Sequence, residues 1–97
     1  DTTAECLDVI ENEGSWEYLF RYDNSYNALM IEKGSVCING ISLTAFGLRE
    51  NHFKVAVIPY TFTHTNIRNL KPGSIVNIEF DMVGKYVNRI QELKNHG

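Results

Sequence analysis

The sequence predicts an all-β fold, a closed barrel of six short antiparallel strands with short helices and a C-terminal helix. Residues 16–22, WEYLFRY, alternate with a period of two and are rich in aromatic residues, which is typical of a strand. The pair Asn39-Gly40 lies between two apolar runs and is a strong signal for a two-residue hairpin turn. Short segments of this kind recur along the 97 residues, and closing them into a barrel removes exposed strand edges.

The composition indicates one soluble globular domain, because 97 residues suffice for a single core and 43% of them are hydrophobic. No apolar run approaches the roughly 20 residues that a membrane span needs. Lys and Arg are scattered in a chain of net charge −3. We therefore expect neither a membrane nor nucleic acid as a partner. Cys6 and Cys37 indicate a buried pair of free thiols in a cytoplasmic protein, with a disulfide as the alternative.

The first half of the chain contains two predicted hairpins with a short helix between them. A first strand ends at the acidic turn 11–14 and pairs with the strand at residues 16–22. Residues 24–33 have helical spacing, and we expect Gly34 to close that helix as a left-handed cap. The second hairpin consists of residues 36–38 and 41–48 on either side of Asn39-Gly40.

The second half contains two further strands and a helical segment. After the polar turn at residues 49–52, the strand FKVAV ends at Pro59, which cannot donate to a strand ladder. Residues 60–70 are expected to hold one or two helical turns, and Lys71-Pro72-Gly73 leads into the last strand, SIVNIEFD. We expect residues 1–81 to form the barrel and residues 82–97 a C-terminal helix and tail, whose apolar stripe packs on the barrel or on another copy.

Conventional catalytic and metal-binding motifs are absent from the sequence. His52, His64 and His96 lie in unrelated places, so we expect no metal. What remains is a set of hydroxyls and one carboxylate at strand ends and loops: Thr2, Thr3, Ser42, Thr44, Thr61, Thr63, Thr65 and Asp81. Such groups suit a neutral heteroaromatic ligand. The alternative is ordinary turn chemistry, because Ser and Thr commonly bond to their own backbone.

Four collinear motifs carry a family resemblance. They are KGSVCINGISLT (33–44), VAVIPYTFTHTNI (55–67), LKPGSIVNIEFD (70–81) and GKYVNRI (84–90). Together they resemble the second lumazine-binding barrel of riboflavin synthases, whose chains contain two such barrels in tandem. The resemblance implies a Greek-key barrel, and DTTA at residues 1–4 matches the end of a motif that begins earlier in the family. We therefore expect a piece of a longer protein that lacks its first barrel.

The resemblance also implies a reaction and a site. Riboflavin synthases convert two molecules of 6,7-dimethyl-8-ribityllumazine into riboflavin and 5-amino-6-ribitylamino-pyrimidinedione by transfer of a four-carbon unit, without a cofactor. The family's active site forms between this barrel and the N-terminal barrel of a neighbouring subunit in a homotrimer, so the chain alone is expected to be inactive. The implied catalytic residues are Ser42, Thr44 and Asp81. The implied substrate-binding residues are Thr2, Thr3, Lys33, Ser42, Leu43, Thr44, Ala56, Val57, Ile58, Pro59, Tyr60 and Thr61.

Two alternatives to the enzyme remain. One is a non-catalytic lumazine- or flavin-binding protein of the same family, which would use the barrel to hold a chromophore. The other is an oligomerisation module acting through residues 83–93. Tyr60 and His64 depart from the residues that many members of the family carry at these positions, which affects the expected contacts with the ribityl chain.

Overall fold

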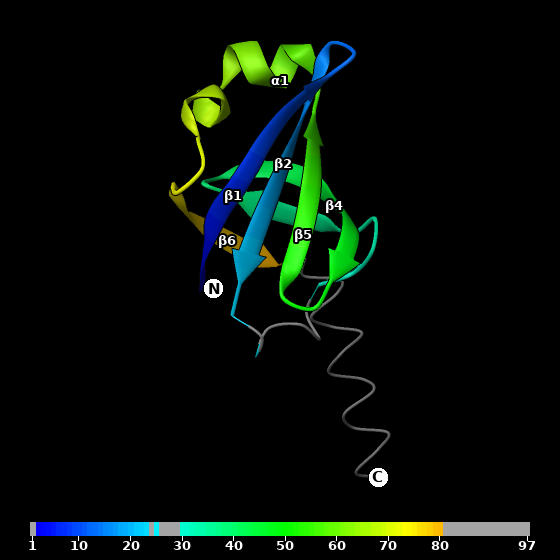
Figure 1. The fold of residues 1–97 in the computed structure, drawn as a ribbon, viewed down its shortest axis with the longest axis vertical. Coiled ribbons are helices and arrows are strands. Elements are labelled where there is room, and N and C mark those ends of the chain that lie inside the picture. Colours follow the sequence, from blue (N-terminus) through cyan, green and yellow to red (C-terminus); the bar gives the residue numbers. More distant parts are fainter. Residues whose placement is uncertain (1, 24, 26–29, 81–97) are drawn as a thin grey trace, which may run out of the picture.

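The computed structural model describes residues 2–23, 25 and 30–80, and within them the chain forms a closed barrel of antiparallel strands (Figure 1). The strands are β1 (Thr2–Asn12), β2 (Ser15–Tyr22), β3 (Ser35–Ile38), β4 (Ile41–Arg49), β5 (His52–Val57) and β6 (Ile75–Phe80). Two short helices, α1 (Pro59–His64) and η2 (Asn66–Asn69), connect β5 to β6. The predicted fold class is therefore confirmed. The expected helix at residues 82–97 lies outside the described residues. Of the expected helix at residues 24–33, only residues 25 and 30–33 are described.

The strand order around the barrel is β1-β2-β5-β4-β3-β6, and β6 returns to pair with β1. Three of the neighbouring pairs are hairpins, whereas β2 pairs with β5 and β6 pairs with both β3 and β1. Every described strand thus has two partners, which leaves no strand edge open within this part of the chain.

The tight turns carry the left-handed backbone that the sequence predicted for Asn39-Gly40. Asn39 has φ +48° and Gly40 φ +86°, as a two-residue turn matched to the twist of a hairpin requires. Asn39 is also fixed to the neighbouring strand, because its side-chain Oδ1 accepts a hydrogen bond of 2.8 Å from the backbone N–H of Asn77. Glu13-Gly14 makes an equivalent turn between β1 and β2.

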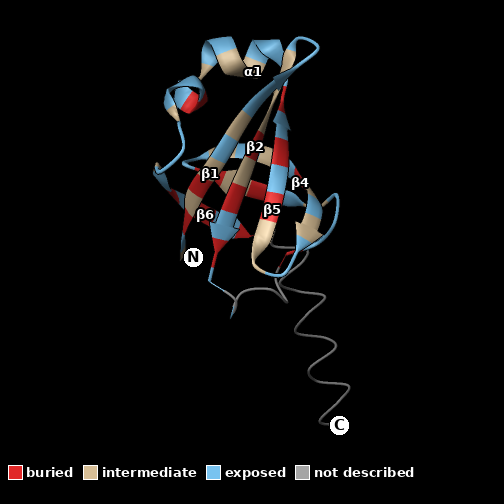
Figure 2. Cartoon of the chain, in the orientation of Figure 1, coloured by how far each residue is buried: buried red, intermediate tan, exposed pale blue. Residues whose placement is uncertain are grey.

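The core lies inside the barrel, where alternate residues of each strand point inward (Figure 2). The predicted strand at residues 16–22 is confirmed as β2, and its alternate residues Tyr18, Phe20 and Tyr22 are buried. Phe20 stacks on Phe53 of the neighbouring β5 with ring centroids 5.3 Å apart. Burial of such aromatic side chains contributes roughly 1.5–3 kcal/mol each, so the contact between Phe20 and Phe53 stabilises the pairing of β2 with β5.

Two expectations about single residues are wrong. The left-handed residue after residues 30–32 is Lys33, with φ +63°, and not Gly34. Gly34 instead accepts a 2.8 Å hydrogen bond from Ala45 of β4, and a Cβ at this position would lie 2.9 Å from the carbonyl oxygen of Ile31. The glycine is thus needed for close approach. Both thiols are free, but only Cys6 is fully buried, because Cys37 lies on the outer face of β3 and is half-buried.

Helix α1 lies across one end of the barrel and is held there by an aromatic stack (Figure 1). The rings of Trp16 on β2 and Phe62 on α1 are 3.6 Å apart and nearly parallel. The following helix η2 is tied down by the buried Tyr18 hydroxyl, which donates a 3.1 Å hydrogen bond to the carbonyl of Ile67. No helix in the described residues has the length and apolar character that crossing a membrane would require.

Candidate functional site

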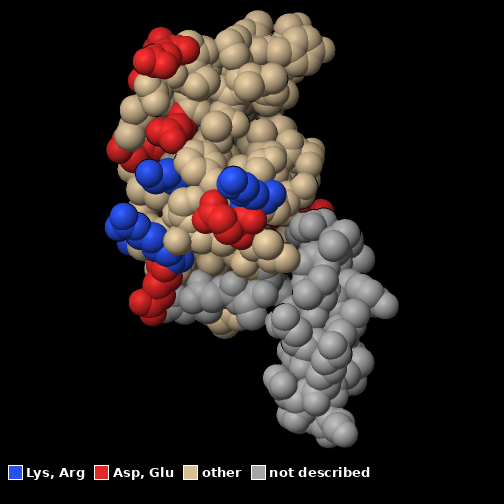
Figure 3. All heavy atoms as spheres, turned by 90° about the vertical axis from the view of Figure 1, so that its right-hand side faces the viewer, with Lys and Arg blue, Asp and Glu red and all other residues tan. Residues whose placement is uncertain are grey.

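An uncharged groove lies on the outer surface of the barrel, between β4, the end of β5 and α1. Its volume is about 370 Å³. Its lining combines hydroxyl-bearing and apolar side chains: Ser42, Leu43, Thr44, Phe46, Ala56, Ile58 and Thr61. Seen from the side of β4 and β5, a broad area of the described surface carries neither Lys and Arg nor Asp and Glu (Figure 3). The groove therefore suits a neutral ligand with both ring and hydrogen-bonding edges.

Strand alternation places the hydroxyls of β4 in the groove. Ser42 and Thr44 are exposed two residues apart, while Ala45 between Thr44 and Phe46 is fully buried. On β5, Ala56 is exposed between the buried Val55 and Val57. The small Ala56 side chain leaves room beside the β4 hydroxyls.

The chain leaving β5 completes the groove. Ile58 is exposed directly before α1, which Pro59 begins with its preset φ and missing N–H. Thr61 lies in the first turn of α1, and its position depends on the docking of the next residue, Phe62, against Trp16. The groove lining thus comes from three consecutive elements, β4, the end of β5 and the first turn of α1, within residues 42–61.

The hydroxyls of Ser42, Thr44 and Thr61 have no hydrogen-bond partner among residues 2–23, 25 and 30–80. Two other hydroxyls, those of Thr65 and Ser15, act as ordinary cap and turn groups. Thr65 donates to the carbonyl of Thr61 at 2.7 Å, and Ser15 donates to the carbonyl of Asn12 at 3.0 Å. Local turn chemistry therefore explains Thr65 and Ser15, whereas the three groove hydroxyls remain available to a ligand.

Several residues of the predicted site lie elsewhere. Val57 points into the core and is fully buried. Pro59 and Tyr60 are exposed on α1 without lining the groove, and the Tyr60 ring stacks on His64 at 4.1 Å. Thr2 and Thr3 belong to a separate depression at the start of β1. Asp81 lies outside the described residues.

Lys33 lies beside the groove strand without lining the groove itself. Its backbone N–H donates a 2.7 Å hydrogen bond to the carbonyl of Ala45, which is flanked by Thr44 and Phe46. Phe46 is a groove residue that was absent from the predicted site. The period of two that relates Ser42 to Thr44 continues to Phe46, and this signal would have found it.

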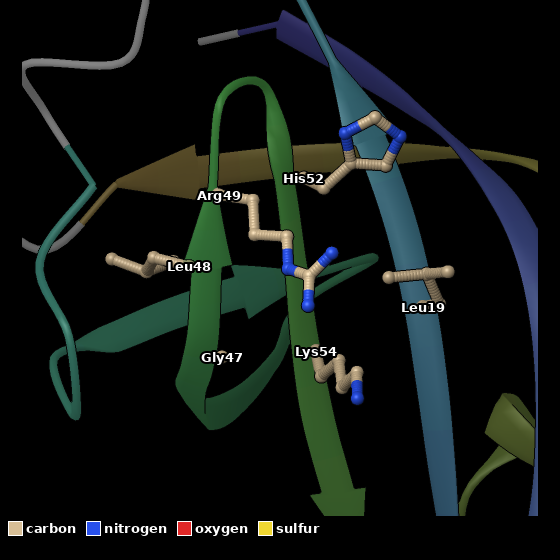
Figure 4. A pocket seen from close by; sticks show the side chains of 6 residues that line it. All are labelled: Leu19, Gly47, Leu48, Arg49, His52 and Lys54. Atoms are coloured by element: carbon tan, nitrogen blue, oxygen red, sulfur yellow. The ribbon is translucent and has the colours of Figure 1, made fainter.

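A larger depression of about 540 Å³ lies on the same side of the barrel and is basic (Figure 4). It is lined by Leu19, Gly47, Leu48, Arg49, His52 and Lys54. Lys54 also lines a neighbouring depression with Asp8 and Glu17, so carboxylates balance part of this positive charge. No residue of the predicted site belongs to the basic depression.

The groove can act through hydrogen bonds and shape, since its lining contains no ionisable side chain. The described residues contain no group of three or more His, Cys, Asp or Glu side chains that could hold a metal ion. The nearest thiol on the same outer face is Cys37, which is paired in the strand register with Ser42. Any chemistry at this groove would therefore need acid–base groups from the ligand, from residues outside the described part or from a partner.

The fold of this barrel and its similarity to known proteins together place it in a family. The fold and the groove define a small closed β-barrel with an uncharged depression on its outer surface. The lumazine binding domain family matches residues 1–81, and the chain belongs to that family. The resemblance to riboflavin synthases found in the sequence is thereby confirmed.

The chain is similar to curated riboflavin synthases. It is 40% identical over 87 residues to that of Actinobacillus pleuropneumoniae, covering 90% of this chain and 40% of the relative. It is 38% identical over 95 residues to that of Bacillus subtilis (strain 168), covering 98% of this chain and 44% of the relative. The chain thus spans less than half the length of these relatives.

A solved structure shows the same fold. The crystal structure of LumP complexed with 6,7-dimethyl-8-(1'-D-ribityl) lumazine superposes with a TM-score of 0.76 at 19% identity, covering 81% of this chain and 45% of that one. The barrel found here is therefore a known architecture.

Proposed function

We propose that this chain is the C-terminal half-site of a riboflavin synthase and binds 6,7-dimethyl-8-ribityllumazine in the groove between β4 and α1. The observation that carries the proposal is an uncharged groove in which three hydroxyls, from Ser42, Thr44 and Thr61, meet without a hydrogen-bond partner in the described part of the chain. The similarity to riboflavin synthases over most of the chain supports the same ligand.

The groove matches the chemical character of a lumazine. Leu43, Phe46 and Ile58 offer apolar surface to the faces of the ring, and the hydroxyls offer donors and acceptors to its polar edge. A volume of about 370 Å³ is within the range of small-molecule sites. We propose that Lys33, whose backbone is bonded to β4 at Ala45, meets the polyol chain of a ligand that extends past Thr44.

The proposed reaction is a cytoplasmic transferase reaction between two lumazines. Loss of a proton from the acidic 7-methyl group of one lumazine gives an anion delocalised over its ring, and hydrogen-bond donors stabilise that anion. Ser42 and Thr44 are the proposed donors in this barrel, and Asp81 is the proposed acid–base group. The anion then attacks the second lumazine, and four carbons move to give riboflavin and the pyrimidinedione.

One groove in this chain would hold one lumazine, so the second must come from another barrel. We propose that an N-terminal barrel of a neighbouring subunit, in a homotrimer, faces the groove and brings the two ligands together. Orientation of two bound reactants can replace several kcal/mol of encounter entropy. The chain alone is then expected to bind lumazine without turnover.

The ligand assignment is tested by titrating the chain with 6,7-dimethyl-8-ribityllumazine and following ligand fluorescence. We expect saturable binding, and a Kd raised about tenfold or more in Ser42→Ala/Thr44→Val, because two neutral hydrogen bonds contribute roughly 0.5–1.5 kcal/mol each. The matched control is Thr63→Val, which removes an exposed hydroxyl from α1 outside the groove. Equal Kd values for the double variant and the control would refute the assignment.

Turnover separates the enzyme from a chromophore-binding relative. Purified N-terminal barrel of a riboflavin synthase is added to the lumazine-loaded chain, and riboflavin is measured by its absorbance. Riboflavin formation that depends on both barrels supports the enzyme. Binding without any product in the mixture supports the non-catalytic alternative.

A further inference from the structure

We infer that Glu32 is a positioning residue for the groove, an exposed carboxylate that shapes β4 and fixes the Lys33 turn beside it. This inference rests on the proposed function, since it concerns how the same groove is held. Glu32 belongs to the turn before β3 and does not line the groove.

The first observation is a bulge in β4. Phe46 pairs with Lys54 and Arg49 pairs with His52, so Gly47 and Leu48 together face the single residue Phe53 of β5. Gly47 has φ +62°, the left-handed conformation found at the first position of one common bulge type. A bulge leaves local N–H groups without partners in the ladder, and these groups need an acceptor.

Glu32 supplies that acceptor. Its Oε2 accepts a hydrogen bond of 3.0 Å from the N–H of Gly47, and its Oε1 accepts one of 3.0 Å from the N–H of Leu48. Two successive amides thus converge on one carboxylate, as in an anion-binding backbone nest. Hydrogen bonds to an ionised group are stronger than neutral ones, so Glu32 stabilises the bulged conformation over a regular strand.

The bulge sets which side chains of β4 face the core beyond Phe46, at the end of the groove. Ala45 points inward and Phe46 outward, and the extra residue lets Leu48 pack on the core while Arg49 is exposed. Figure 4 shows Leu48 and Arg49 leaving β4 in opposite directions. Without the extra residue, the period of two would turn Leu48 outward and Arg49 inward, or move Phe46 out of the groove.

The same carboxylate connects the bulge to the Lys33 turn. Lys33 and Gly34 are bonded to Ala45 at 2.7 Å and 2.8 Å, one residue before the bulge region begins at Phe46. The turn at residues 31–34 is therefore attached to β4 through backbone bonds at Ala45 and through the Glu32 side chain at Gly47 and Leu48. Lys33 and the groove wall are held as one unit.

The test compares the lumazine affinity of Glu32→Gln with that of a control variant in which another carboxylate loses its charge. Gln has the size of Glu, but its amide group can accept from only one of the two N–H groups and turns a donor toward the other. The control is Glu50→Gln in the β4–β5 turn, since the Glu50 carboxylate has no hydrogen bond within the described part of the chain. We expect Glu32→Gln to raise the Kd about tenfold and Glu50→Gln to leave it within twofold.

A double-mutant cycle separates positioning from general destabilisation. If Glu32 acts by fixing Lys33, Lys33→Met and Glu32→Gln lower affinity less in combination than the sum of their separate effects. Affinities are compared at concentrations of folded protein measured by circular dichroism, which removes the contribution of unfolding. Amide hydrogen exchange should accelerate at Gly47 and Leu48 in Glu32→Gln.

The outcomes distinguish this inference from the proposed function. If the wild type binds lumazine and folded Glu32→Gln binds it with the same Kd, the role of Glu32 is overturned. The proposed function then still stands. Additive effects in the cycle overturn the connection to Lys33. Absence of lumazine binding by the wild type removes the proposed function and this inference with it.

Discussion

At the scale of single residues, the groove hydroxyls differ from the hydroxyls that act in turns and caps. Thr65 and Ser15 donate to nearby backbone carbonyls, whereas Ser42, Thr44 and Thr61 meet in a groove without partners in the described residues. Buried polar groups are almost always satisfied within the protein. Ser42 and Thr44 are exposed and Thr61 is half-buried, so water can satisfy these three hydroxyls.

The two cysteines provide a prediction at the same scale. Burial raises the pKa of the Cys6 thiol above its ordinary value of 9.0, and the thiol is fully buried, whereas Cys37 is half-buried on the outer face of β3. The thiolate is the reactive species, so a disulfide reagent at pH 8 should label Cys37 at least tenfold faster than Cys6. Stopped-flow absorbance measures both rates. A fast phase that persists in Cys37→Ser would contradict this assignment.

At the scale of elements, the groove depends on how α1 is docked. Among the described residues, the stack of Phe62 on Trp16 is the only aromatic contact between α1 and β2. Thr61 directly precedes Phe62. An aromatic pair contributes about 0.5–1.5 kcal/mol beyond the area it buries. The position of Thr61 thus follows from a contact that is itself outside the groove lining.

We predict that Phe62→Leu lowers both stability and lumazine affinity. The loss of the ring stack should cost about 1 kcal/mol in the free energy of unfolding and raise the Kd several-fold, because Thr61 and Ile58 lose their support. Urea denaturation and fluorescence titration measure the two effects. Lower stability with unchanged affinity would show that α1 docking does not position the groove.

Tyr18→Phe is predicted to lower stability alone. The Tyr18 hydroxyl is buried and bonds the carbonyl of Ile67, which also accepts a 3.1 Å hydrogen bond from Leu70. Since the carbonyl keeps one partner, we expect a loss of about 1 kcal/mol in the free energy of unfolding and no change in Kd. A loss above about 3 kcal/mol would mean that η2 as a whole is released.

The sequence predicts the regular strands and hairpins better than it predicts the irregular positions, the bulge in β4 and the left-handed Lys33. Alternation in WEYLFRY and the Asn39-Gly40 pair suffice for β2 and the second hairpin because both signals are local. The bulge at Gly47-Leu48 and the left-handed Lys33 depend on the contact between Glu32 and β4, which lie fifteen residues apart in sequence. Periodicity could place Ser42 and Thr44 on one face, but the contribution of Thr61 requires the docked helix.

At the scale of the whole molecule, the closed barrel buries ionisable groups that resist losing a proton. Burial raises the pKa of the Cys6 thiol above 9.0 and those of the Tyr18 and Tyr22 hydroxyls above 10.0. In the unfolded chain these groups ionise at their ordinary pKa. The unfolded state therefore binds fewer protons in this range, and stability falls as the pH rises.

We predict that the contribution of these three groups to the free energy of unfolding is constant below about pH 8.5. It should decline from about pH 9 upward. Urea denaturation at pH 7.5, 9 and 10.5 measures the decline. In Cys6→Ala the part of the decline that begins near pH 9 should disappear, while the tyrosine part above pH 10 remains. Stability that rises between pH 9 and pH 10.5 would contradict the assigned directions of the pKa shifts.

The central claim is that lumazine binds in the groove between β4 and α1. Two-dimensional NMR of the ¹⁵N-labelled chain, titrated with 6,7-dimethyl-8-ribityllumazine, tests it most directly. We predict saturable shifts concentrated at the amides of Ser42, Thr44, Phe46, Ala56 and Thr61, with little change at Thr3, Glu11 and Asn77 on other sides of the barrel. Shifts centred on Arg49, His52 and Lys54, or no saturable shifts at the groove, would contradict the claim.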